Sequence, residues 1–223
     1  MKHPLGVLVR IALFAVTLFL WAWARSRPLS RTLDLLLILG GVALVFPVVY
    51  VGRKVLDRRP TTSRAAWTTA FVHFTLMVLL GVAIIRAVIT HRDWPGCTLP
   101  IPAEVGRFLM MITGAAALLT VLNLAWKGLG APFAIALSSR LTADWCYGWT
   151  RNPMVLATLA FLLAVGIWFQ SALFVLWVIV LVTPAWLVFV KVYEERELEI
   201  RFGATYLEYK SRTPMLFPRR PGR

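Results

Sequence analysis

The chain has 223 residues, of which 59% are hydrophobic and only 15% are charged. Its mean hydropathy is +0.74, and soluble globular domains rarely have so apolar a composition. The composition therefore excludes a soluble domain and predicts an integral membrane protein. The net charge of +14 would indicate nucleic-acid binding in a soluble chain. Here the basic residues cluster beside apolar segments, so we expect no nucleic-acid partner and interpret the charge as positive-inside bias.

Four apolar segments are each long enough to cross a bilayer, which takes about 20 residues of helix. They are Leu5–Ala24, Leu33–Gly52, Ala66–Thr90 and Gly106–Trp126. Arg10, near the start of the first segment, can reach the headgroups by snorkelling. Basic residues follow that segment directly, with no small-residue cleavage site, and we therefore expect an uncleaved first span.

Two further apolar segments, Pro153–Phe169 and Ala172–Val190, are separated only by Gln170 and Ser171. So short a link predicts an antiparallel helical hairpin. The expected fold is all-α: a polytopic membrane helical bundle of about six membrane segments, with this C-terminal hairpin followed by a cytoplasmic C-terminal helix. We expect one membrane-embedded domain, made of N-terminal transmembrane helices (1–126) and a region with a polar loop, the hairpin and the C-terminal segment (127–223).

The distribution of basic residues predicts the orientation. If the N-terminus is cytoplasmic and six segments cross, 18 of the 24 Lys and Arg residues lie on the inside. Both termini and the loop Lys127–Arg151 are then cytoplasmic. Cys97 and Cys146 lie on opposite sides in this arrangement, so we expect no disulfide between them.

Two ionisable residues lie within the third span, where such a residue is a functional hypothesis by default. Arg86 is close to the outer end of the span, and we expect it to snorkel to the interface. His73 is compatible with either a hydrogen-bonded helix contact or a place in a substrate cavity.

The loop Lys127–Arg151 is polar and too long for a simple connection. Asn152 suits a helix N-cap and Pro153 suits the first helical position. The free N–H groups there could bind a carboxylate or phosphate beside Arg140 and Arg151. This feature alone favours a well-capped hairpin with interfacial arginines.

A charged helix directly continues the second helix of the hairpin. Glu194, Leu198 and Phe202 have i, i+4, i+8 spacing and share one face, which places a carboxylate on the face expected to pack inward. Glu197 and Arg201 form an i, i+4 pair, and we expect that pair to be solvated.

Motifs for other chemistry are absent from the sequence. No strand–GxGxxG–helix unit occurs, and Gly128-Leu129-Gly130 is a weak signal on its own. HExxH, paired CxxC and GxSxG motifs are also missing, so we expect neither metal-dependent nor serine hydrolysis, and no metal site.

Two motifs together carry a family resemblance. They are Arg151-Asn152-Pro153-Met154 and, after the hairpin, Glu194-Glu195-x-x-Leu198-x-x-x-Phe202-Gly203-x-x-Tyr206-x-x-Tyr209-x-x-x-x-Pro214-x-x-x-Pro218. With this pairing, about Gly128–Pro218 resembles the isoprenylcysteine carboxyl methyltransferase family and its phospholipid methyltransferase relatives. The resemblance implies a multi-pass enzyme, which we expect in a bacterial inner (plasma) membrane. It also implies S-adenosylmethionine as cofactor and a lipophilic acceptor: a prenylcysteine carboxylate, a phospholipid amine or a small lipophilic molecule.

The resemblance assigns the cofactor to the loop before the hairpin and to the helix after it, and it names no catalytic residue. The implied cofactor-binding residues are Gly128, Gly130, Leu141, Thr142, Tyr147, Arg151, Asn152, Pro153, Met154, Glu194 and Glu195.

Some positions depart from the family pattern. Val155 replaces a common Tyr, Trp145 a usual Gly and Gly148 a frequent Arg. Val190 stands where the prenylcysteine enzymes have an Arg that recognises the substrate carboxylate. Lys191 could replace that Arg only if the helix were rotated by about 100°, so the substrate need not be a prenylcysteine.

Two alternatives remain open. One is a membrane sterol-type reductase that uses NADPH, since such reductases share a related C-terminal architecture. The other is a transporter or scaffold without enzymatic activity. Retention of S-adenosylmethionine, of NADPH or of neither distinguishes the three.

Overall fold

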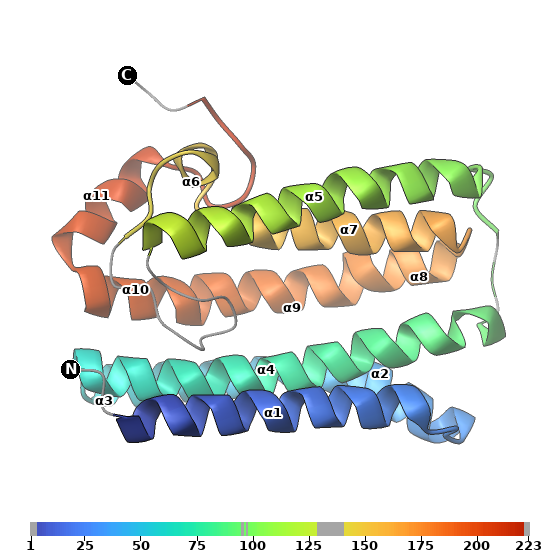
Figure 1. Ribbon diagram of the computed structural model, residues 1–223, viewed down its shortest axis with the longest axis horizontal. Helices are drawn as coiled ribbons and strands as arrows, with labels where there is room; N and C mark the ends of the chain where they lie inside the picture. Colours follow the sequence, from blue (N-terminus) through green and yellow to red (C-terminus); the bar gives the residue numbers. More distant parts are fainter. Residues whose placement is uncertain (1–3, 95, 97, 129–140, 221–223) are drawn as a thin grey trace. The chain divides into compact units, whose positions relative to one another are not determined.

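The computed structural model describes residues 4–94, 96, 98–128 and 141–220. Helices account for the regular structure of these residues, apart from one isolated bridge between Thr98 and Ser171 (Figure 1). Five helices are long and apolar enough to cross a membrane: Gly6–Ser26, Arg31–Arg58, Thr62–Asp93, Ala103–Trp126 and Ala172–Phe202. A shorter apolar helix covers Pro153–Trp168. The predicted all-α polytopic fold, with its C-terminal hairpin, is confirmed.

The chain forms two compact units. The described part of the first unit comprises residues 4–94 and 184–201, and that of the second comprises 96–128, 141–183 and 202–220. The long helix that begins at Ala172 contributes to both.

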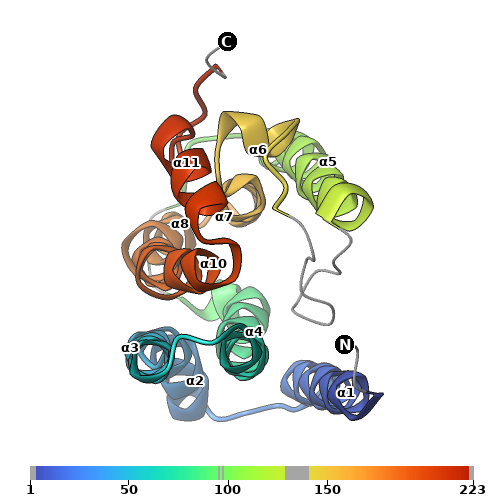
Figure 2. The same ribbon diagram turned by 90° about the vertical axis from the view of Figure 1, so that its left-hand side faces the viewer.

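The first unit is built around α4 (Thr62–Thr90), which packs against each of the three helices before it. These are α1 (Pro4–Ser26), α2 (Arg31–Ala43) and α3 (Val45–Arg58). Figure 2 looks along the helices and shows α4 between α3 and α1. The side chains of Ser30 and Thr61 accept hydrogen bonds from backbone N–H groups at the starts of α2 and α4. Local capping therefore sets where both helices begin.

A small residue brings α1 and α4 together. A Cβ atom at Gly81 would lie 2.2 Å from Nε1 of Trp21, so no larger residue fits without a shift. The same indole N–H donates a 3.0 Å hydrogen bond to the Met77 carbonyl. Close approach at small residues, with polar groups bonded across the interface, is typical of helix packing in membranes.

The expectation that Arg86 snorkels to the interface is wrong. Only 2% of Arg86 is exposed, and its Nε lies 2.6 Å from Oδ1 of Asp34. Its Nη1 donates to the carbonyls of Ala24 and Arg27 at the end of α1. The last carbonyls of a helix lack intrahelical partners, and a buried guanidinium needs several acceptors. Arg86 thus ties α1, α2 and α4 together.

His73 makes the helix contact that the sequence left open as one of two roles. Its Nδ1 lies 2.9 Å from the carbonyl of Thr69, one turn earlier on α4. Its ring meets that of Phe189 edge-on at a centroid distance of 5.2 Å.

The second unit pairs α5 (Ala103–Gly128) with α7 (Pro153–Trp168) along their lengths. Gly106, near the start of α5, lies against the backbone of Trp168 at the end of α7, and Gly114 lies against Phe161. The two helices are therefore antiparallel. The unit also contains α6 (Cys146–Trp149), α8 (Ala172–Trp177) and α11 (Ala204–Arg212). Gln170 has a φ of 53° in the link between α7 and α8, as the tight turn of a hairpin requires.

The helix from Ala172 to Phe202 contains two π-helical turns, η3 (Val178–Val182) and η4 (Phe189–Glu194). Between and after them lie α9 (Thr183–Val188) and α10 (Glu195–Phe202). Pro184 has no N–H to donate, and the Thr183 hydroxyl donates to the Val178 carbonyl at 2.9 Å. In η4, the N–H of Glu195 donates to the carbonyl of Val190, five residues earlier.

Candidate functional site

The start of α7 lies well before the end of its partner helix α5. Gly106 lies opposite Trp168 and Gly114 opposite Phe161, so Pro153 is level with about residue 121 or 122 of α5. The helix α5 continues to Gly128, which is about 9 Å further at 1.5 Å per residue. The segment that precedes α7 therefore lies alongside the last turns of α5 and not beyond the end of that helix.

Asn152 occupies the N-cap position of α7 and Pro153 begins the helix, as predicted. The Asn152 side chain makes no capping hydrogen bond. Its Nδ2 instead donates to the carbonyl of Met215 at 2.9 Å. Asn152 thus fastens the C-terminal segment to the start of the hairpin.

Further hydrogen bonds join residues 149–152 to the C-terminal segment. The N–H of Arg151 donates to the Pro214 carbonyl at 2.9 Å, and the Thr150 hydroxyl donates to the Met215 carbonyl at 3.1 Å. The N–H of Arg219 donates to the Trp149 carbonyl at 3.0 Å. The two sequence motifs are therefore in direct contact within the second unit, which gives a physical reason for their occurrence together.

Tyr209, in the second motif, adds a side-chain bond to the residues just before the first motif. Its hydroxyl donates to the carbonyl of Tyr147 in α6 at 2.7 Å. Burial raises the pKa of Tyr209, with the positive charge of Arg151 opposing that shift. The phenol therefore stays protonated at neutral pH, as the hydrogen bond requires.

A pocket of about 340 Å³ with both polar and apolar walls lies between the loop before α7 and the helix α11. Leu141 lines it from the loop and Gly148 from α6, and the α11 residues that line it include Thr205, Tyr209 and Arg212. Beside Leu141, the buried Thr142 hydroxyl has no hydrogen-bond partner among the described residues. An unsatisfied buried hydroxyl is costly, and here it belongs to a residue that the sequence assigned to ligand binding.

Asn123 is a candidate that the sequence analysis missed. It lies in α5 and is 6% exposed, and neither polar atom of its side chain has a partner in the described part of the chain. From the register of α5 and α7, it is level with about residues 151 and 152. A single carboxamide within an apolar span was the available signal.

The backbone at Trp145 adopts a conformation that side chains disfavour. Its φ is 50° and its ψ is −122°, immediately before α6. Glycine adopts this region without a Cβ penalty, and glycine is the residue that the family resemblance leads one to expect at this position. The side chain itself is 71% exposed.

The acidic residues of the long helix belong to the first unit. Glu194 ends η4 and is half-buried, whereas Glu195 begins α10 and is buried. Glu197 forms the predicted pair with Arg201 at 2.7 Å. The expectation of a solvated pair is wrong, because only 3% of Glu197 is exposed. A π-helical turn adds about one residue and so rotates the later faces by about 100°, which a straight α-helix does not anticipate.

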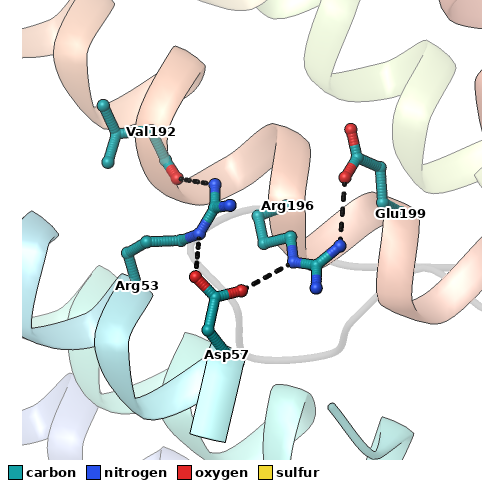
Figure 3. A network of polar contacts seen from close by, with 5 residues as sticks. All are labelled: Arg53, Asp57, Val192, Arg196 and Glu199. Atoms are coloured by element: carbon teal, nitrogen blue, oxygen red, sulfur yellow. Dashed lines mark hydrogen bonds and ion pairs between the residues drawn. The ribbon is translucent and has the colours of Figure 1, made fainter.

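Charged side chains from α3 hold η4 (Figure 3). Arg53 donates from Nη1 to the Val192 carbonyl at 3.0 Å, and its Nε lies 2.6 Å from Oδ2 of Asp57. Arg196 donates to the other oxygen of Asp57 at 2.9 Å and lies 3.4 Å from Glu199. Arg53 thereby satisfies a carbonyl within the irregular turn that ends at Glu194.

The remaining predicted residues lie as follows. Gly128 is the last residue of α5, and Gly130 lies outside the described residues. Met154 is half-buried in the first turn of α7. In η4, Val190 is buried and Lys191 is exposed. The cysteine Cys146 is a free thiol, and Cys97 lies outside the described residues. Among the described residues, no group of His, Cys, Asp or Glu is arranged to hold a metal ion.

The five long apolar helices define a multi-pass helical membrane protein. Its candidate site lies at the start of the shorter helix α7. The phospholipid methyltransferase family model matches residues 103–205, from the first residue of α5 to the second residue of α11. This segment is therefore similar to that family, in the isoprenylcysteine and phospholipid methyltransferase group that the paired motifs indicated. No curated protein and no solved structure matches the chain.

Proposed function

We propose that the protein is a membrane-embedded methyltransferase that uses S-adenosylmethionine and acts on a lipophilic acceptor. The observation that carries the proposal is the set of hydrogen bonds that join Tyr147 to Tyr209 and residues 150–152 to Pro214 and Met215. These contacts lie within or next to the segment that matches a family of methyltransferases.

The residues of the second unit fit a polar ligand. Thr142 offers a buried hydroxyl without a partner, and Asn123 offers a buried carboxamide without one, among the described residues. A bound ligand that hydrogen-bonds to them would remove the cost of leaving them unsatisfied. When bound, S-adenosylmethionine would supply the methyl group.

The chain's own contribution is binding and orientation. Leu141, Thr142 and Tyr147 would line the cofactor in the loop, and residues 151–154 would hold it at the start of α7. A transfer reaction gains most from holding its two reactants close together in a fixed orientation, an effect of about 7–11 kcal/mol in well-oriented cases. The hydrogen bonds from residues 149–152 to the C-terminal segment limit the motion of this wall.

A lipophilic acceptor suits the depth of the site. The start of α7 lies alongside the last turns of α5 and not beyond its end. A lipophilic acceptor would therefore reach the site without leaving the bilayer. Exclusion of water at that depth would also protect the reaction from hydrolysis. Glu194 and Glu195 belong to the first unit, and their role in cofactor binding stays a prediction, as do those of Gly128, Gly130, Val190 and Lys191.

Calorimetry on the full chain in detergent tests the proposal. S-adenosylmethionine should bind, S-adenosylhomocysteine should compete and NADPH should not bind. Binding of NADPH alone would favour the reductase alternative. A folded protein that binds none of the three would contradict the proposal and favour a transporter or scaffold. A radiolabelled methyl donor, supplied with lipids and small lipophilic molecules, would then identify the acceptor.

Replacement of Asn123 by Leu sharpens this test. Removing an unsatisfied buried carboxamide should leave the stability of the folded protein unchanged or raise it, while binding of cofactor or acceptor weakens. Thr113→Val is the control, because the Thr113 hydroxyl is already bonded to the Leu109 carbonyl of α5. Equal ligand affinity in the two variants would remove Asn123 from the site.

A further inference from the structure

An apolar groove of about 660 Å³ lies in the first unit between α3 and α4. It extends from Leu44 to Val55 on α3 and from Arg64 to Thr75 on α4. Its walls are almost entirely apolar, and Arg64 is the one charged side chain among the described residues that line it. The groove therefore has an apolar end and a charged end.

The apolar end of the groove coincides with a break in the span that α2 and α3 form. Leu44 caps both helices, and Pro47 follows in the first turn of α3. Proline lacks an N–H and commonly bends a helix. Both residues line the groove.

The groove has the depth of one leaflet. Eleven residue steps on either helix correspond to about 16 Å, and half of a hydrocarbon core of about 30 Å is about 15 Å. Val51 is 62% exposed and Phe71 is also exposed, so the groove opens sideways to the surroundings of the helices. A single extended hydrocarbon chain matches this length and these walls.

The charged end carries an excess of basic side chains. Lys54, Arg58 and Arg59 lie near the end of α3, and Arg64 begins the groove on α4. None of these four forms an ion pair among the described residues. The nearby acid, Asp57, is already bonded to Arg53 and Arg196. An anionic headgroup would be attracted to this end, because each basic residue near an anionic lipid surface contributes to binding.

We propose that the groove binds one acyl chain of an anionic phospholipid, with its phosphate at Arg64 and the end of the chain near Leu44 and Thr75. The apolar walls exclude a free phosphate as the main occupant, and the excess of like charge opposes a second copy of the chain. The groove lies on helices outside the segment that matches the methyltransferase family, so this proposal does not rest on the proposed methyl transfer.

Native mass spectrometry of the full chain in a mild detergent tests the proposal. Phosphatidylglycerol and phosphatidylcholine with identical acyl chains are compared as probes. The wild-type protein should retain one phosphatidylglycerol in preference to phosphatidylcholine. Arg64→Gln should reduce that preference about fivefold, the effect of one basic residue beside an anionic lipid. Arg25→Gln is the control, because Arg25 lies at the end of α1 that contacts Arg86, far along α4 from Arg64. This change should leave the lipid preference unchanged.

A variant that fills the groove distinguishes binding of the acyl chain from electrostatic attraction of the lipid headgroup. Val51→Trp should abolish retention of phosphatidylglycerol, whereas Leu119→Trp, at an exposed position of α5, should preserve it. Circular dichroism of both variants checks that they fold. Equal retention of the two lipids by the wild-type protein would overturn the proposal, as would undiminished retention in a folded Val51→Trp protein. A protein dimer that Val51→Trp separates would assign the groove to a second copy and would also overturn it.

Discussion

At the scale of single residues, Trp145 shows a conflict between backbone and side chain. A φ of 50° with a ψ of −122° suits glycine, and residues held in such regions store about 1–3 kcal/mol of strain. The exposed indole makes the position accessible to substitution without disturbing a core.

We expect Trp145→Gly to be more stable than Trp145→Ala by about 1 kcal/mol. Glycine relieves the strain, although its greater freedom in the unfolded chain offsets part of the gain. Unfolding in detergent measures the difference. At Trp149, which is helical and also exposed, the order should be reversed, because glycine is unfavourable in helices. Equal stabilities of Trp145→Gly and Trp145→Ala would show that the loop carries no such strain.

Glu194 provides a second comparison at this scale, which rests on the proposed function. Glu194→Gln should weaken binding of S-adenosylmethionine about ten- to a hundredfold, the value of a charge-assisted hydrogen bond. Glu199→Gln, on the same helix and paired with Arg196, should leave affinity nearly unchanged. Glu197 is unsuitable as the control, because its burial with Arg201 makes a substitution there disturb the helix. Calorimetry giving equal affinities for the two variants would remove Glu194 from the site.

At the scale of elements, helix positions followed from the sequence much better than helix faces did. Runs of apolar residues located the spans, because crossing a bilayer requires a long uninterrupted helix. The face of the helix after Glu194 was not predictable from i, i+4 spacing, because η4 changes the register. The π-helical turn depends on tertiary contacts, such as that of Arg53 with the Val192 carbonyl, which no local pattern encodes.

In the candidate site, too, local features were predictable from the sequence and long-range contacts were not. Asn152 and Pro153 were located correctly by capping rules, which are local. That the Asn152 side chain binds Met215 was not predictable, because the partner lies 63 residues away in the sequence. Arg86 was misjudged for a similar reason: its partners Asp34, Ala24 and Arg27 come from two earlier helices.

The packing of α5 on α7 yields a prediction at the scale of elements. A Cβ atom at Gly106 would lie 2.2 Å from the backbone nitrogen of Trp168, whereas one at Gly114 would meet Phe161 at an ordinary 3.5 Å. Gly106→Ala should therefore destabilise the protein by about 1–3 kcal/mol through overpacking. Gly114→Ala should be neutral or stabilise it by up to about 1 kcal/mol through helix propensity. Thermal unfolding in detergent distinguishes them, and similar effects of the two changes would contradict this packing.

At the scale of the whole molecule, the number of crossings depends on α7. Its 16 residues extend about 24 Å, less than a hydrocarbon core of about 30 Å. It nevertheless runs antiparallel to α5. It ends, just before the turn at Gln170, at the level where α5 begins. If α5 and the helix from Ala172 both cross, α7 and the residues before it have to bring the chain back across. Under that condition the predicted number of six crossings is retained, and it stays a prediction.

Two introduced cysteines test this number whichever way the protein is oriented in the membrane. Ser26 is the last residue of the first span and Ser211 lies in α11, after the last span, and both are exposed. In a background with Cys97 and Cys146 replaced by Ser, a membrane-impermeant maleimide should reach Ser26→Cys and Ser211→Cys from opposite sides, because five crossings separate them. The basic residues further predict that Ser211→Cys is labelled from the cytoplasm, in inverted vesicles and not in intact cells. Labelling of both positions from the same side would mean that only four crossings separate them, and that α7 enters the membrane without crossing it.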